Sequence, residues 1–210
     1  MKLMLVGASG LVGKRVLRQA LANPAVNRLI APTRKPLAAA SGLDNPIVDF
    51  ERLPARASWW KVDAVICTLG TTMAQAGSQS AFRRVDHDYP LAVARLARAA
   101  GAAAFVLNSA LGAAVDSHVF YNRVKGEVEA AITGLGYPSL TLVRPSLLDG
   151  GPRPDRRPGE RVALWFAGIV RPLLPARYRA GTTDRVAHTL LAAALAQAPG
   201  VLVIESERIA

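Results

Sequence analysis

The chain has 210 residues, of which 51% are hydrophobic and 20% are charged, and it contains one cysteine. This length and composition predict one globular domain, residues 1–210, and exclude a disordered protein, a disulfide scaffold and a cysteine-based zinc cluster. The formal net charge is +11. Because the basic residues are scattered and no nucleic-acid motif with interleaved aromatic residues occurs, we expect no nucleic-acid partner.

No apolar run reaches the length of a membrane helix, since the alanine-rich stretch 99–115 is interrupted by Asn108 and Ser109. The first residues show no secretory h-region. The three histidines are too dispersed to suggest a metal site. We therefore expect a cytoplasmic protein, a monomer or a homodimer, with no membrane partner and no metal.

Apolar runs of strand length alternate with helical patterns along the whole chain. The first strand is expected at residues 3–6, and the helical pattern that follows the glycines ends at Asn23-Pro24. Further strands are expected at residues 28–31, 46–49, 64–68, 103–107, 140–143 and 201–204. Further helices are expected at residues 80–100, 120–135, 161–169 and 183–196. The alternation predicts a Rossmann-type doubly wound parallel α/β sheet.

A stretch rich in proline and glycine, residues 150–159, is the only linker-like segment of the chain. It follows the predicted strand at 140–143, at the edge of the sheet where ligands bind in such folds. We therefore expect residues of about 150–180 to form a small C-terminal cap that faces the substrate.

The residues Gly7-Ala8-Ser9-Gly10-Leu11-Val12-Gly13 stand between the first strand and the first helix. Gly7 allows the tight turn, Gly10 lets the backbone approach a pyrophosphate, and Gly13 lets the helix pack closely on the strand. The helix N-terminus then offers free N–H groups and the positive end of its dipole to the anion. This context predicts a dinucleotide site.

The end of the second strand carries Thr33-Arg34-Lys35 and no carboxylate. An NAD-specific site places an acidic residue there to accept from the ribose hydroxyls. Arg34 is placed to pair with a 2′-phosphate and Lys35 to assist, although both are also compatible with solvated loop charges. The sequence therefore favours NADP(H) over NAD(H).

Two further segments are expected on the cofactor. Asp49, followed by Phe50, ends the predicted third strand; its carboxylate either accepts from the adenine amino group or caps a turn. Thr68-Leu69-Gly70 is a loop of mostly small residues that lets the chain pass close to the nicotinamide side. Cys67 before it is predicted to be a buried apolar residue and not a nucleophile.

Tyr121 and Lys125 stand four residues apart and share one helical face. An ammonium beside a phenol favours the phenolate and is expected to lower the pKa of the tyrosine, which then exchanges a proton with a carbonyl oxygen. Ser109, just past the fifth strand, is placed to hold that oxygen. In the alternative interpretation, Tyr121 and Lys125 are surface residues of the helix and Ser109 is a helix cap.

Taken together, these motifs resemble the atypical NAD(P)-binding branch of the short-chain dehydrogenase/reductase superfamily. The glycine spacing of the first loop is that of extended and atypical members. More narrowly, the chain resembles the Tat-interactive-protein oxidoreductase group. The stretches that carry this resemblance are residues 67–72, 84–89, 108–113, 120–129 and 144–146.

The resemblance implies a Rossmann fold with NADP(H), and a triad in which Ser109 orients the substrate, Tyr121 is the acid/base and Lys125 binds the ribose. Asn108, adjacent to Ser109, is expected either to contact the cofactor or only to shape the end of the strand. The backbone of Pro145, Ser146 and Leu147 is implied to cover the nicotinamide.

The chain departs from the superfamily in its fourth catalytic residue, an asparagine for which no position is assigned. Asp86 lies nearby, in the helix predicted at residues 80–100, but it is not an asparagine. The expected function is an NADP(H)-dependent oxidoreductase that acts on a small carbonyl or alcohol of unknown identity. The alternative is an NADPH-sensing regulatory protein of the same fold with little or no turnover, because some relatives act as regulators.

Overall fold

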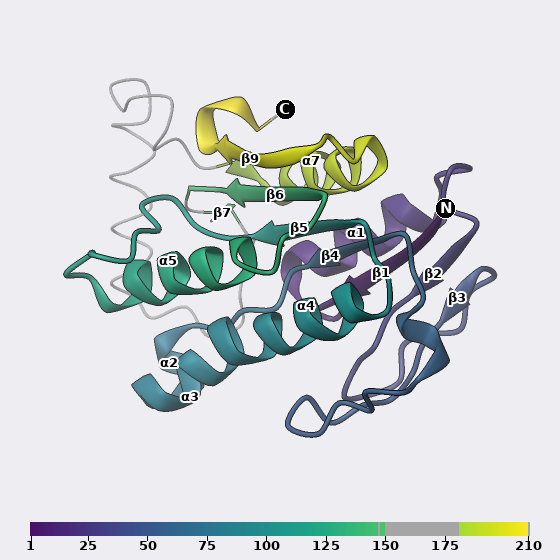
Figure 1. The fold of residues 1–210 in the computed structure, drawn as a ribbon, viewed down its shortest axis with the longest axis horizontal. Helices are drawn as coiled ribbons and strands as arrows, with labels where there is room; N and C mark the ends of the chain where they lie inside the picture. The colour runs from purple at the N-terminus through teal and green to yellow at the C-terminus, as the bar shows by residue number, and fades with distance from the viewer. Residues whose placement is uncertain (147, 150–180, 210) are drawn as a thin grey trace.

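The computed structural model describes residues 1–146, 148–149 and 181–209. Seven strands form one parallel sheet in the order β3-β2-β1-β4-β5-β6-β9 (Figure 1). Their bounds are β1 Lys2–Val6, β2 Arg28–Ile30, β3 Leu43–Asp44, β4 Ala64–Cys67, β5 Ala104–Asn108, β6 Ser139–Arg144 and β9 Gly200–Glu205. The predicted doubly wound Rossmann-type fold is confirmed, and the strand order reverses direction between β1 and β4.

Helices cover both faces of this sheet (Figure 1). Helices α1 (Leu11–Leu21) and α7 (Thr183–Ala196) pack together on one face. Helices α4 (Tyr89–Ala99) and α5 (Phe120–Thr133) lie on the other. The central strands are buried on both sides, as in β4, because each strand carries apolar residues toward both helical layers.

The remaining elements are short. They are the α-helices α2 (Met73–Ala76) and α3 (Gln79–Arg83), the 3-10 turns at Ser58–Trp60 and Ser206–Arg208, and a π-helical turn at Arg84–Asp88. Two strands of two residues each, β7 (Leu148–Asp149) and β8 (Gly181–Thr182), form a separate parallel pair. The expected cap at about 150–180, with its loop at 150–159 and its helix at 161–169, lies outside the described residues.

The prediction of a strand at 46–49 is wrong, because the third strand of the sheet is β3, Leu43–Asp44. Ala31 N donates to Asp44 O. In a regular parallel pairing, the backbone N–H of residue 46 would then donate to Ala31 O, but residue 46 is a proline. Proline has no N–H, and Asn45 Nδ2 donates to Ala31 O at 2.6 Å instead. The pairing continues beyond this point only as a single bridge between Thr33 and Ile47.

The single helix expected at 80–100 is interrupted. It consists of α3, the π-helical turn Arg84–Asp88 and α4, which follow one another directly. A π-helical turn has a wider ring than an α-helix and occurs often at functional sites. Here it carries Asp86, which is buried.

Candidate active site

The registers of the sheet bring the predicted site residues to one edge. Val6 pairs with Cys67, so β1 and β4 end side by side, and Gly7 and Thr68 follow them. The carboxyl ends of parallel strands next to a reversal of strand order form the crevice in which such folds bind ligands. The glycine loop and the loop after β4 therefore line the same crevice.

Gly7 adopts a left-handed backbone with φ +90°, which other residues rarely adopt. A Cβ atom at this position would lie 2.6 Å from Thr68 Oγ1 and 2.7 Å from Thr68 C. Thr68 is fixed in turn, because its backbone N and its Oγ1 both donate to Val6 O. The close approach of the two loops thus requires glycine here.

Gly13 has less room for a side chain than the other glycines of the loop, since a Cβ atom on it would lie 2.0 Å from Gly7 O. The N-terminus of α1 therefore sits directly on the glycine turn. Gly10 caps this helix with extended backbone, no side-chain hydrogen bond caps it, and its first turn has no acidic residue. The first N–H groups and the positive helix end are available to an anion, and the loop fits a pyrophosphate.

The other residues of the loop divide into two groups. Ser9, Gly10 and Leu11 are exposed. The side chains of Ala8 and Val12 are buried in the core with α1, so these two residues can offer a cofactor only their backbone.

At the end of β2, Thr33 is buried, whereas Arg34 and Lys35 are exposed. None of the ion pairs among the described residues involves either cation. The loop is fixed by Asn45, whose Nδ2 donates to Thr33 Oγ1 and whose Oδ1 accepts from Leu37 N. Sequence reasoning missed Asn45, because its role depends on the pairing of β2 with β3.

The structure shows the turn-capping alternative for Asp49, whose Oδ1 accepts from Glu51 N at 2.9 Å. Phe50 is buried in the core and packs on Tyr89, with ring centroids 5.6 Å apart. The Phe50 ring is therefore part of the core, and Phe50 can offer a cofactor only its backbone.

Tyr121 and Lys125 lie one turn apart near the start of α5. Lys125 is only 4% exposed, whereas Tyr121 is 37% exposed and packs its ring against Phe82. Burial raises the pKa of Tyr121, Lys125 opposes this effect and Asp86 reinforces it. The prediction that Lys125 lowers the pKa of Tyr121 below its ordinary value is therefore wrong for the protein without ligands: the net shift of this pKa is upward.

The partner of Lys125 is Asp86, which sequence reasoning noticed but gave no role. Lys125 Nζ lies 2.8 Å from Asp86 Oδ1, and Thr71 N donates to Asp86 Oδ2 at 2.8 Å. Burial lowers the pKa of Lys125, but the charge and hydrogen bond of Asp86, with a contribution from Tyr121, outweigh it and raise the pKa.

Ser109 stands directly after β5 and is 4% exposed. Its N donates to Val143 O, but its buried Oγ has no hydrogen-bond partner among the described residues. The neighbouring Asn108 Oδ1 is likewise buried and unpartnered there. Buried polar atoms are rarely left unsatisfied, so both atoms are free to bond a bound molecule.

The loop after Ser109 packs on α5 beside the tyrosine and the lysine. Ala114 N donates to Asn122 O, and a Cβ atom on Gly126 would lie 2.3 Å from Ala114 C. Pro145 O accepts from Leu111 N and joins this loop to the end of β6. Ser146 follows at this edge, whereas Leu147 lies outside the described residues.

Cys67, at the end of β4, is fully buried, and burial raises its pKa to about 12. A thiol in this state is a weak nucleophile. The sequence prediction of an apolar role for Cys67 agrees with this environment.

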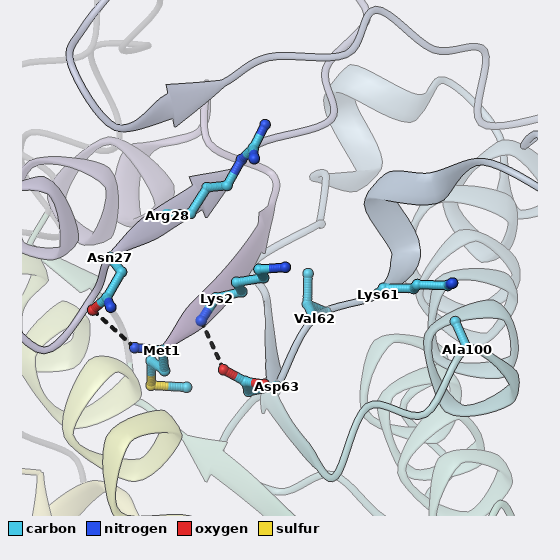
Figure 2. A pocket seen from close by; sticks show the side chains of 8 residues that line it. All are labelled: Met1, Lys2, Asn27, Arg28, Lys61, Val62, Asp63 and Ala100. Atoms are coloured by element: carbon cyan, nitrogen blue, oxygen red, sulfur yellow. Dashed lines mark hydrogen bonds between the residues drawn. The ribbon is translucent and has the colours of Figure 1, made fainter.

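A pocket of about 470 Å³ lies at the opposite edge of the sheet, near the amino ends of the strands (Figure 2). Two of its charged lining side chains have partners: Asp63 accepts from Lys2 N, and Arg28 pairs with Asp44, which lies outside the pocket lining. We place the candidate site at the carboxyl edge, because the glycine loop and the unpartnered Ser109 Oγ lie there.

No family model matches the chain. It is 37% identical over 176 residues to "Protein fmp52, mitochondrial" of Emericella nidulans, which covers 79% of this chain and 74% of that protein. It is 38% identical over 169 residues to "Protein HTATIP2" of Rattus norvegicus, which covers 78% of this chain and 69% of that protein. The chain belongs to the fmp52–HTATIP2 family.

This family relationship confirms the resemblance to atypical short-chain dehydrogenases/reductases of the Tat-interactive-protein type. Among solved structures, MoeE5 in complex with UDP-glucose and NAD has a TM-score of 0.71 at 16% identity, covering 97% of this chain and 75% of that chain. The oxidoreductase ylbE from Lactococcus lactis has a TM-score of 0.66 at 18% identity, covering 97% and 90%. At these identities the likeness shows the fold alone, a Rossmann-type α/β sheet.

The cytoplasmic location expected from the sequence is contradicted by the fmp52 relatives, which are named as mitochondrial proteins. The expectation rested on the lack of a secretory h-region, of an apolar run of membrane length and of a disulfide framework, and none of these features distinguishes the cytoplasm from the mitochondrion. Within the described part of the chain, none of the helices has the length and apolar character needed to cross a bilayer.

Proposed function

We propose that the chain is an NADP(H)-dependent oxidoreductase that transfers hydride between the nicotinamide and a carbonyl or alcohol carbon. The observation that carries this proposal is the buried, unpartnered Oγ of Ser109 at the edge that also holds Tyr121 and Lys125. A substrate oxygen would supply the missing partner of this hydroxyl. The family and fold support the class of reaction.

The glycine loop and the N-terminus of α1 would bind the pyrophosphate, and Arg34 and Lys35 would bind the 2′-phosphate. When bound, the nicotinamide supplies or accepts the hydride. Ser109 Oγ donates a hydrogen bond to the substrate carbonyl oxygen and holds it. Tyr121 donates its phenolic proton to that oxygen during reduction, and takes the proton back in the reverse direction.

Purified protein is expected to consume NADPH, followed by its absorbance at 340 nm, with at least one member of a panel of aldehydes and ketones. Tight NADPH binding without consumption across the panel would contradict the enzyme and favour the regulatory alternative. Absence of binding to either nicotinamide cofactor would contradict both functions.

Arg34→Ala is expected to weaken NADPH binding by about 10- to 100-fold, because charge-assisted hydrogen bonds to a phosphate contribute about 1.5–3 kcal/mol. NADH has no 2′-phosphate, so its affinity should stay nearly constant, and the preference for NADPH should narrow. Calorimetric titration with both cofactors measures this.

Arg95→Ala is the matched control for Arg34→Ala. Arg95 is an exposed arginine of α4, so its removal changes the net charge equally but leaves the β2 edge intact. It should leave both affinities unchanged. Equal affinities of the unaltered protein for NADPH and NADH would defeat the argument for Arg34.

A further inference from the structure

Asp86 is a buried acid in an unusual place. It belongs to the π-helical turn Arg84–Asp88 between α3 and α4, and it is 1% exposed. A buried carboxylate is costly unless it is paired and hydrogen-bonded. Both of its oxygens are engaged, Oδ1 with Lys125 Nζ and Oδ2 with Thr71 N, each at 2.8 Å.

The pair is held from three directions. Asp86 comes from the π-helical turn, Lys125 from α5 and Thr71 from the loop after β4. Gly70 in the same loop lies against the pair, since a Cβ atom on it would be 3.3 Å from Asp86 Oδ1 and 3.9 Å from Lys125 Nζ. The lysine head is therefore fixed in position as well as in charge.

The charges near Tyr121 come from few groups. Burial is the largest cause of the raised pKa of Tyr121, and Lys125 and Asp86 then act on the phenol with opposite signs. The Cys67 thiol on β4 interacts with both charged groups. Arg83 and Glu127 also join α3 to α5, but they pair with each other. A lone ammonium would stabilise the phenolate, and the adjacent carboxylate offsets that effect.

We propose that Asp86 is a positioning residue of the reaction: it fixes Lys125 beside Tyr121 and offsets the lysine charge, so that Tyr121 stays a neutral phenol able to donate its proton. The inference rests on the proposed function. It assigns to this chain a site poised for carbonyl reduction, because reduction consumes the phenolic proton and alcohol oxidation requires the phenolate.

The test is the titration of Tyr121 by NMR of ¹³Cζ-labelled tyrosine in the full chain. In Asp86→Asn the side chain keeps its shape and loses its charge. The Tyr121–Lys125 pair should then lose its first proton at a pH about one unit or more below that in the unaltered protein. The reason is that, without the Asp86 carboxylate, the Tyr121 phenolate is the anion that remains to pair with the Lys125 ammonium. The pH at which alcohol oxidation reaches half its maximum rate should fall by the same amount.

Asp88→Asn is the matched control, because Asp88 is an acid of the same turn that is exposed and paired with His87. It should leave the Tyr121 titration unchanged. If Asp86→Asn does not fold, Asp86→Ser replaces it, since the smaller side chain leaves room for water beside Lys125. The titration of Tyr121 should shift in the same direction.

A titration that is the same in the unaltered protein and in the folded Asp86 variant would overturn the inference. So would an equal shift in Asp88→Asn, which would show a general effect of charge. The NMR readout does not require turnover. A protein that consumes no NADPH therefore refutes the proposed function while the titration still decides the role of Asp86 toward Tyr121.

Discussion

Tyr121→Phe is expected to lower kcat for carbonyl reduction by about 10²- to 10⁴-fold, the range that a positioned general acid contributes. The substitution removes only the hydroxyl, and the remaining ring keeps its packing against Phe82. The affinity for NADPH should therefore stay nearly unchanged. Steady-state kinetics and a binding titration on the same preparation separate the two effects.

Tyr137→Phe is the matched control for this variant. Tyr137 is buried in the core beneath α4, and its hydroxyl donates to Ala94 O. Loss of that bond should cost about 0.5–1.5 kcal/mol of stability and leave kcat unchanged. Retention of full activity in Tyr121→Phe would remove Tyr121 from the acid/base role.

Gly13→Ala is expected to weaken NADPH binding by about 100-fold or more. The added Cβ atom would lie 2.0 Å from Gly7 O, a backbone atom, so α1 or the glycine turn must move. A displaced turn loses charge-assisted hydrogen bonds to the pyrophosphate, each of which contributes about 1.5–3 kcal/mol, so the loss of about two such bonds accounts for the expected effect. Overpacking should also lower the free energy of unfolding by about 1–3 kcal/mol, which chemical denaturation measures.

Gly134→Ala provides the comparison for this substitution. Gly134 follows α5 with φ −64°, and a Cβ atom on it would have its nearest neighbour at 3.5 Å, an ordinary contact. Its substitution should leave cofactor binding intact. NADPH affinity in Gly13→Ala equal to that of the unaltered protein would show that the turn does not hold the pyrophosphate.

The sequence predicted most of the sheet because parallel strands buried on both faces are short, nearly continuous apolar runs. The predicted strand at 64–68 and helix at 183–196 correspond to β4 and α7. The prediction failed at 46–49, where the side chain of Asn45 takes over a hydrogen bond that Pro46 cannot make. A periodicity argument does not detect this exchange, because it involves one side chain and the neighbouring strand.

For the candidate site, local patterns identified the residues whose chemistry depends on their own element. The glycine loop, Tyr121 and Lys125 are of this kind, since each pattern lies within one turn or one helical face. The π-helical turn was not predicted, because its residues continue an ordinary helical pattern. The pairing of Asp86 with Lys125 joins positions 39 residues apart and follows only from the packing of that turn on α5.

The sequence by itself determined the class of fold, the position of the glycine loop and the candidate triad, because these follow from residue type and short-range spacing. Only the tertiary structure decided which groups face one another. It joined Asn45 to Thr33, left Ser109 Oγ without a partner among the described residues and set Asp86 against Lys125. Burial of the Tyr121 side chain raises its pKa most, Lys125 opposes this effect and Asp86 reinforces it, so the direction of the shift was decided by packing and not by the Tyr-x-x-x-Lys pattern.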